Sequence, residues 1–279
     1  IVLKVHIDEK GRMENGMKML YEHFQLAPEL GSLLDPTTIK ADAFTASFEE
    51  LQPVLKRALE NEADTEQLER GVMAAGIAKA GQLLAKQYTL QITNVPYLVR
   101  GKHGDLMAKF CETNYPESKN DLATVFTERM CKTALNNCTI CTVMPQNWLF
   151  LSSYKSFRNG ILKNQSFDFI VWLGDNAFTT PLGVSPILMS LRTKKTSERD
   201  NFFEIDLSVF KSPVELNENI KTKQCKFVNQ KSQLQNPDSR IGSGIKNSEN
   251  LLSIYADSSH GQGSFDTNRF SFFFWELTQ

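Results

Sequence analysis

The sequence predicts an α/β fold with a largely parallel sheet, and two patterns lead to this class. Short runs that are typical of strands lie at 88–93, 138–144, 167–173 and 187–192. Helical patterns at about 120–135 and 153–162 separate the first three of these runs. Strands that alternate with helices along a chain indicate a parallel α/β sheet.

The fourth strand-like run follows the third too closely for a full helix to lie between them. The connection contains Gly174, Pro181 and Gly183, which favour turns. Parallel neighbours need a long crossover, whereas antiparallel strands can be joined by a short loop. We therefore expect residues 187–192 to form an antiparallel strand at the edge of the sheet.

Helices dominate the sequence before the first strand. Residues 1–27 have an amphipathic pattern that Gly11 and Gly16 interrupt, which predicts a broken helix. Further helical patterns lie at 49–59 and 65–86. At the other end, residues 217–250 are rich in Asn, Gln, Lys and Ser and predict a long loop or linker. An apolar block at 270–275 would begin the next domain.

The composition allows one sizeable domain, or one domain and part of another. The chain has 279 residues, and 41% of them are hydrophobic. A net charge of −1 weighs mildly against a strongly basic nucleic-acid binder. Two local basic patches could contact phosphates, although such runs are more often solvated loops. They comprise Arg192, Lys194, Lys195 and Arg199, then Lys221, Lys223, Lys226 and Lys231. No apolar run approaches the roughly 20 residues that span a bilayer.

The cysteines give no support for a metal site or a disulfide framework. Their number, five, is odd and is consistent with a reducing cytoplasm. Cys138 and Cys141 have the spacing of a metal-binding pair, but they lie in a predicted strand and so point to opposite faces. No second pair completes a zinc site. We expect core cysteines and no metal ligands.

The segment Asn94-Val95-Pro96-Tyr97 stands at the carboxyl end of the first predicted strand. An amide oxygen can accept one hydrogen from a planar exocyclic amine, and the next backbone carbonyl can accept the second. The tyrosine ring supplies a face for stacking. Taken alone, the segment is more often a plain turn, because Asn tolerates unusual backbone angles and the residue before proline stays extended.

Three further segments follow in order and strengthen the chemical interpretation of this tetrad. They are Asn114-Tyr115-Pro116-Glu117-Ser118-Lys119-Asn120-Asp121-Leu122, Trp148-Leu149-Phe150-Leu151-Ser152-Ser153 and Asp266-Thr267-Asn268-Arg269-Phe270. The tetrad resembles the Asn-Pro-Pro-Tyr motif of methyltransferases that modify amino nitrogens. Together, the four segments resemble the adenine-specific DNA methyltransferases of phage-exclusion (BREX-type) and large restriction-modification systems. The resemblance covers roughly residues 26–200 and 260–276.

This resemblance implies part of a Rossmann-like sheet of an S-adenosylmethionine-dependent methyltransferase, with a helical insert. Residues 1–87 would be the helical part and insert, residues 88–200 the catalytic half, and residues 201–279 a linker and the start of a target-recognition region. The implied enzyme transfers a methyl group from S-adenosylmethionine to the exocyclic amino group of adenine in double-stranded DNA. It would act in restriction-modification or phage defence, in the cytoplasm and without a membrane, beside other subunits of a defence system.

The resemblance also implies roles for individual residues. The target adenine must leave the duplex, because its amino group is inaccessible inside the stack. Asn94 and the carbonyl of Val95 would accept the two amine hydrogens, and Tyr97 would stack on the base. No general base with a shifted pKa is needed. Positioning would supply most of the rate.

Other site residues carry two interpretations each. Trp148 and Phe150 could line the pocket for the flipped base, or they could pack under the sheet edge, as large aromatic residues usually do. Asp266, Asn268 and Arg269 could orient the link to the DNA-reading part, or they could form only a turn.

The chain departs from the family pattern in two places. Val95 replaces a proline, so the rigid ring is lost and a backbone N–H is added that needs a partner. We expect weaker or absent activity from this change. The glycine-rich cofactor loop of the family does not precede Asn94, so we expect a fragment whose cofactor-binding residues are unknown, with Asn94 as a candidate. A cofactor loop placed later, at Gly261-Gln262-Gly263, has the wrong context.

Two alternative functions stay open at this point. The tetrad also occurs in methyltransferases that act on RNA or on a protein glutamine amide, although the downstream segments argue against them. The chain could also be a catalytically silent DNA-binding or interaction module descended from a methyltransferase. Val95 and the missing cofactor loop favour the silent module.

Overall fold

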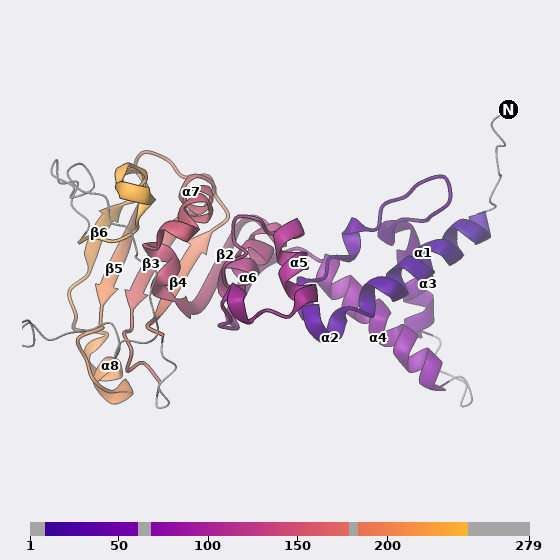
Figure 1. Cartoon of the computed structure of the whole chain (residues 1–279), viewed down its shortest axis with the longest axis horizontal. Helices are drawn as coiled ribbons and strands as arrows, with labels where there is room; N and C mark the ends of the chain where they lie inside the picture. The colour runs from indigo at the N-terminus through magenta and orange to yellow at the C-terminus, as the bar shows by residue number, and fades with distance from the viewer. Residues whose placement is uncertain (1–8, 61–67, 179–183, 245–279) are drawn as a thin grey trace, which may run out of the picture. The chain divides into compact units, whose positions relative to one another are not determined.

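The structure is a computed structural model that describes residues 9–60, 68–178 and 184–244, all of which belong to one unit (Figure 1). The helices are α1 (Glu9–Phe24), α2 (Ala27–Leu30), α3 (Phe48–Glu60), α4 (Leu68–Ala85), α5 (Asp105–Asn114), α6 (Leu122–Lys132), α7 (Lys155–Asn164) and α8 (Pro213–Asn219). The strands are β1 (Tyr88–Asn94), β2 (Ala134–Pro145), β3 (Ser166–Trp172), β4 (Pro186–Arg192), β5 (Asn201–Asp206) and β6 (Lys226–Asn229). Short 3₁₀ helices are η1 (Gly31–Leu33), η2 (Pro36–Thr38), η3 (Arg100–Lys102), η4 (Gln146–Leu149), η5 (Ser152–Tyr154), η6 (Lys231–Gln235) and η7 (Pro237–Ser239).

The strands form one mixed sheet in the order β1-β2-β4-β3-β5-β6. β1 is parallel to β2 and β3 is parallel to β5, while β4 runs antiparallel to both β2 and β3. It follows that β1, β2, β3 and β5 all point the same way. The sheet thus confirms the predicted α/β class, in which parallel strands are joined by helices.

The predicted antiparallel direction of residues 187–192 is confirmed, but their predicted place at the sheet edge is wrong. Figure 1 shows β4 between β2 and β3, where it pairs with both neighbours. A strand in that position has backbone partners on both sides, which an edge strand lacks. The antiparallel edge strand is instead β6, which pairs with β5.

The prediction of one long loop over residues 217–250 is wrong for the part that the structure describes. β6 lies in this region, as do the last turn of α8 and two 3₁₀ helices, η6 and η7. β6 has only four residues and leaves Phe227 exposed, so it carries no alternating pattern that the sequence could reveal. The sheet therefore extends past residue 200, through β5 and β6.

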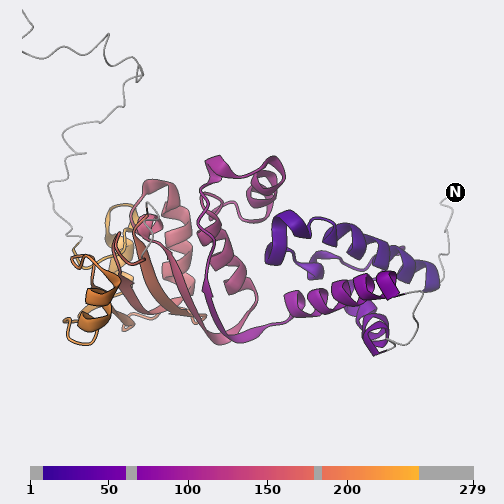
Figure 2. The same cartoon turned by 90° about the horizontal axis from the view of Figure 1, so that it is seen from below.

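Helices α6 and α7 cover one face of the sheet (Figure 2). Their apolar residues join the inward side chains of the strands in one core, at whose centre lie three stacked or edge-on rings. These are Trp148, Phe157 and Phe167. On the other face, Leu216 of α8 packs against Val171 and Ile205, so α8 covers the region of β3 and β5.

The helices that precede the sheet have a core of their own, which includes Leu20, Phe48 and Leu51. The predicted helices at 49–59 and 65–86 correspond to α3 and α4. The prediction of a broken first helix is wrong, because α1 runs unbroken through both glycines. Position 16 is occupied by glycine because the chain approaches closely there: a Cβ atom would lie 2.6 Å from the carbonyl oxygen of Ala46.

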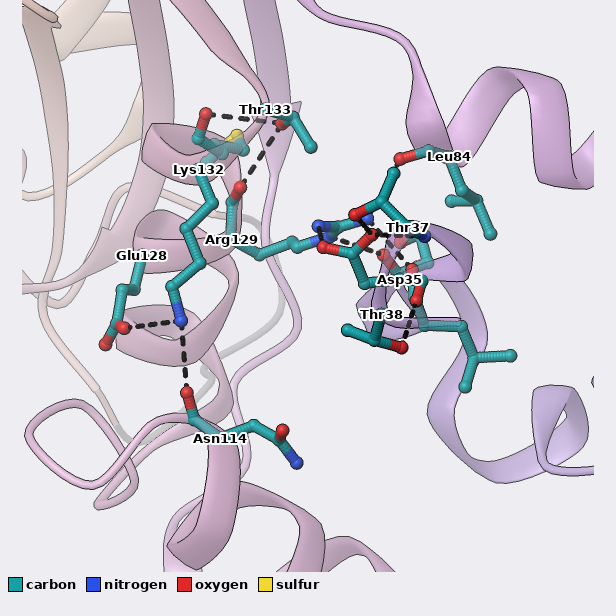
Figure 3. Close-up of polar contacts among 12 residues, drawn as sticks. Asp35, Thr37, Thr38, Leu84, Asn114, Glu128, Arg129, Lys132 and Thr133 are labelled. Carbon is teal, nitrogen blue, oxygen red and sulfur yellow. Dashed lines mark hydrogen bonds and ion pairs between the residues drawn. The ribbon is translucent and has the colours of Figure 1, made fainter. Parts of the chain in front are cut away.

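Arg129 of α6 connects the helical part to the sheet (Figure 3). Its guanidinium donates to Asp35 Oδ2 at 2.6 Å, and to the carbonyl oxygens of Leu34 and Leu84 at 2.9 Å each. The side chain of Arg129 is 6% exposed. Burial acts to raise the pKa of Asp35, but hydrogen bonds from Thr37 and the charge of Arg129 outweigh it and hold that pKa below its usual value.

The described residues include neither a helix that could span a membrane nor a cluster of metal-binding side chains. No helix within residues 9–60, 68–178 and 184–244 is long and apolar enough to cross a bilayer. The same residues contain no group of three or more His, Cys, Asp or Glu side chains that could hold a metal ion. As expected from their strand, Cys138 lies in the core while Cys141 contacts Ser190 on the other face.

Candidate active site

The tetrad lies at the edge of the sheet where the parallel strands end. Asn94 is the last residue of β1 and is paired in register with Val143 of β2. Because β1 is an outermost strand, the side chain of Asn94 is exposed. In open α/β sheets, ligands bind beyond the carboxyl ends of the parallel strands. The location of Asn94 is therefore that of a binding site.

Asn94 and Tyr97 contact each other directly. The Tyr97 hydroxyl donates a hydrogen bond of 3.1 Å to Asn94 Oδ1. Burial, with a smaller effect from the charge of Asp121, raises the pKa of Tyr97 to about 12. The phenol therefore keeps its proton at neutral pH and acts as a donor. An amide oxygen has two lone pairs, so Asn94 can accept a second hydrogen from another group.

Val95 is buried in the core, where it is 3% exposed. Its N–H, which a proline would lack, donates to the carbonyl oxygen of Val143 at 3.4 Å. The added N–H was expected to need a partner, and β2 provides the acceptor. Only the loss of the proline ring's rigidity is left as a reason for weaker activity.

The chain after the tetrad is held against the start of α6. Val99 and Asp121 form an isolated antiparallel bridge, and Leu122 N donates to Leu98 O at 3.0 Å. Asp121 caps α6, because its side chain accepts from Ala123 N at 2.8 Å. The segment after the tetrad and the Asn120-Asp121-Leu122 segment are therefore in contact in the fold.

Asp121 is also the group whose charge acts on Tyr97. It is buried, and burial raises its pKa although hydrogen bonds act in the opposite direction. Burial, with a smaller effect of the Asp121 charge, also raises the pKa of Tyr154 to about 12. Asp121 and Tyr154 line a cavity of about 10 Å³, roughly the space that one water needs. From the sequence, Asp121 was considered only as part of the segment 114–122, and no site role was given to Tyr154.

The structure separates the two aromatic residues for which a base pocket and packing under the sheet edge were both considered. Trp148 is 2% exposed, packs edge-on to Phe157 and stacks on Phe167 in the core, and it also lines the small cavity beside Asp121. Phe150 is half-buried and lines a different cavity, at the ends of β3 and β5. Asp266, Asn268 and Arg269 lie outside the residues that the structure describes, as does Gly261-Gln262-Gly263.

A buried arginine fixes the loop that carries both aromatic residues. Arg158 of α7 is fully buried and donates to the carbonyl oxygens of Trp148 and Leu151 at 2.6 Å each. It also donates to the carbonyl oxygen of Asp238 at 2.8 Å. The arrangement fixes the backbone of η4 and of the residues that follow it.

Residues 23–178 match the Eco57I restriction-modification methylase family. This match covers more than half of the chain. The chain belongs to this family. The expected resemblance to restriction-modification methyltransferases is thereby confirmed for a stretch that includes the tetrad, the start of α6 and the Trp148 segment.

Two relatives of known type share parts of this sequence. The adenine-specific methyltransferase PglX of Lacticaseibacillus casei (strain Zhang) is 39% identical over 82 residues, which are 29% of this chain and 7% of PglX. The adenine-specific methyltransferase BrxX of Escherichia coli O9:H4 (strain HS) is 31% identical over 156 residues, which are 56% of this chain and 12% of BrxX. The aligned part is thus about a tenth of the length of these relatives.

Solved structures of restriction-modification proteins are more distant. A modification subunit of a putative type I restriction enzyme from Vibrio vulnificus YJ016 has a TM-score of 0.44 and 12% identity, over 75% of this chain and 55% of that chain. The type ISP enzyme LlaGI, in complex with a DNA substrate mimic, has a TM-score of 0.43 and 12% identity, over 66% of this chain and 20% of that chain.

Membership of this methylase family implies S-adenosylmethionine as methyl donor. A left-handed glycine, Gly174, follows β3, but the Cα of Ser208 lies 2.8 Å from where its Cβ would be. That glycine therefore lets two loops approach and does not open a cradle for a nucleoside.

Proposed function

We propose that this chain is the part of an adenine-specific DNA methyltransferase that binds the target base. The parent reaction would transfer a methyl group from S-adenosylmethionine to the exocyclic amino group of adenine, in restriction-modification or phage defence. The observation that carries the proposal is the hydrogen bond between Tyr97 and Asn94 at the carboxyl end of β1. Family membership supports the same reaction class.

The chemistry of this chain would consist of holding one amine. Asn94 Oδ1 accepts from Tyr97 and has a second lone pair for the adenine amine. The carbonyl of Val95 would accept the other amine hydrogen, and the ring of Tyr97 would stack on the base. Two acceptors in fixed positions draw the amine out of conjugation with the ring and orient its lone pair. S-adenosylmethionine, when bound, would supply the methyl group.

Double-stranded DNA is the substrate that we propose. The adenine amine is inaccessible in the duplex, so the base must be extruded before Asn94 and Tyr97 can reach it. Unpairing costs a few kcal/mol, and stacking on an aromatic ring recovers part of that cost. Other subunits of a defence system would be further partners of the whole protein.

Methylation by the full-length protein tests this function. With tritiated S-adenosylmethionine and adenine-containing DNA, Asn94→Ala should lower methyl transfer by about a hundredfold or more, since a positioned polar group contributes on that scale. Tyr97→Phe keeps the ring and loses the hydroxyl, so it should lower the rate less than Tyr97→Ala. Unchanged transfer in Asn94→Ala would remove Asn94 from the site and with it the proposal.

One observation favours a second candidate, a catalytically silent module. The left-handed glycine that follows β3, Gly174, packs against Ser208 and leaves no room there for the adenosine of the cofactor. Calorimetry of S-adenosylmethionine binding separates the two functions, using this chain and the full-length protein. Binding by the full-length protein supports the methyltransferase, whereas binding by neither supports the silent module.

A further inference from the structure

A second cavity lies at the same edge of the sheet as the tetrad but belongs to other strands. It has a volume of about 770 Å³, within the range of small-molecule sites. Its walls come from the ends of β3 and β5, from β6 and from the segment after η7. The lining includes Phe150, Trp172, Glu204, Asp206, Lys226 and Arg240. No step proposed above uses this cavity.

The two carboxylates of the cavity are occupied by donors of the chain itself. Glu204 is 6% exposed, and its two oxygens accept from the indole N–H of Trp172 and, at 2.9 Å, from the backbone N–H of Ser243. Asp206 Oδ1 accepts from the N–H and the hydroxyl of Ser208, at 3.0 and 2.6 Å. These acids thus shape the cavity wall and leave little capacity for a cationic ligand.

The cations of the cavity are in the opposite situation. Arg240 Nε is buried without a hydrogen-bond partner, and among the described residues neither Arg240 nor Lys226 has an ion pair. Three members of the predicted basic patches pair with carboxylates: Arg192 with Asp168, Lys194 with Asp200 and Lys231 with Glu198. Arg240 and Lys226, by contrast, bring into the cavity positive charge that no carboxylate of the described residues pairs with. Lys223 also lines the cavity, with its ammonium group over the Phe210 ring, so the cavity offers cations to which an anion would bind.

The aromatic residues in the cavity wall favour an anion that is attached to a sugar or a planar base. The Glu204 contact fixes the orientation of the Trp172 indole, and Phe150 contributes a second ring. We propose that this cavity binds a backbone phosphate of DNA through Arg240 and Lys226, with Trp172 and Phe150 against the adjoining sugar or base. Arginine is suited to phosphate because its planar donors match the phosphate oxygens. The choice of DNA rests on the proposed function.

The sheet sets the distance between this cavity and the flipped base. In strand order, β3 and β5 lie three and four positions from β1. At about 4.8 Å between strands, the separation from Asn94 is roughly 14 to 19 Å. One strand of a duplex places a phosphate every 3.4 Å or so along its axis, so the bound phosphate would be about four to six nucleotides from the target base.

The salt dependence of DNA binding tests this site directly. The full chain would be titrated into a fluorescein-labelled duplex of mixed sequence at several NaCl concentrations, and anisotropy would give the affinity. Each lost phosphate contact should reduce the slope of log K against log salt by about 0.9, and lower the affinity about eightfold near 0.1 M salt. In the double variant Lys226→Gln with Arg240→Gln, the slope should therefore fall by the amount that corresponds to one or two lost phosphate contacts.

A matched control removes the same charge elsewhere. Lys10→Gln with Lys18→Gln changes two exposed lysines of α1 and should leave the slope unchanged. Arg240→Lys keeps the charge and should restore most of the slope, which a variant that merely misfolds would not allow. An unchanged slope in the Lys226/Arg240 double variant, or no binding of the duplex by the native chain at low salt, overturns the proposal.

Failure of the proposed function would look different. Asn94→Ala in the full-length protein should abolish methylation and leave the salt slope intact. Loss of slope in the Lys226/Arg240 variant without any methylation in the native protein would keep the phosphate site and reject the reaction.

Discussion

Arg129 and Arg158 are both buried, but the groups that satisfy them differ. Arg129 faces a carboxylate, Asp35, along with carbonyl oxygens from the helical part. Arg158 faces carbonyl oxygens alone, and burial lowers its pKa while the nearby Asp238 charge acts in the opposite direction. The partners of Arg158 are backbone carbonyl oxygens, so the buried guanidinium stays satisfied only while the backbone of this loop keeps one arrangement.

This difference corresponds to two kinds of connection. Arg129 joins the helical part to α6, and Asp35 on its far side is 28% exposed, so water reaches the pair. Arg158 lies in α7 and holds the loop of Trp148 and Phe150 to the segment of Asp238. We infer that disruption near Arg129 loosens a junction, whereas disruption at Arg158 changes the site.

The largest effect is expected for Arg158→Met. This change removes a donor from three carbonyl oxygens, of which only that of Leu151 keeps another, the N–H of Tyr154, while much of the side-chain volume is retained. Buried acceptors without partners cost about 1–3 kcal/mol each, so the free energy of unfolding should fall by roughly 3–5 kcal/mol. Urea denaturation measures it. Arg192→Met, at an exposed pair with Asp168, is the control and should cost under about 1 kcal/mol. Equal losses in the two variants would contradict the buried role of Arg158.

Arg129→Met should come next. It leaves the Asp35 carboxylate and two carbonyls without their donor, but water can solvate Asp35, so the loss should be about 2–3 kcal/mol. Because the junction and not the sheet is affected, proteolysis should cut the helical part faster while α6 and α7 stay protected. Uniform sensitivity across the chain would show that the arginine supports the whole fold instead.

A third, smaller effect is a difference in how the stability contributed by the two arginines depends on pH. The folded-state pKa of Asp35 is lowered, so its contribution to stability is present above the unfolded pKa of about 3.9 and is lost as pH falls through the folded value. Asp35→Asn should cost about 1 kcal/mol at pH 7, and its difference from the native chain should vanish below that window. The cost of Arg158→Met should show no such dependence. Urea midpoints from pH 7 to pH 3 measure both.

Local patterns predicted the parts of the fold that depend on local sequence. The alternation in β1 and β2 and the spacing of α6 and α7 gave these elements nearly in place, because each has a run long enough to show its period. β4 was predicted as a strand but misplaced, since the choice of partners is decided across the sheet and not within the strand. β6 is too short to show any period.

The site divides in the same way. Asn94 and Tyr97 could be found because their chemistry and spacing are local. The partner of the Val95 N–H could not, because it depends on the register that aligns Asn94 with Val143. Nor could the carbonyl partners of Arg158, which are between seven and 80 residues away along the chain. Arg240 was missed because η7 and its neighbours were assigned to a loop.

The smallest expected effect on stability comes from Val95→Pro, which tests both the register and the chemistry. Proline removes the donor to Val143, a bond that is already long at 3.4 Å, and restricts the backbone in return. The free energy of unfolding should therefore fall by no more than about 1 kcal/mol. In the full-length protein, methyl transfer should rise, because a stiffer turn holds the carbonyl of residue 95 towards the amine. A gain without loss of stability would mean that the Val143 contact contributes nothing, and no gain would mean that Val95 already holds its carbonyl in place.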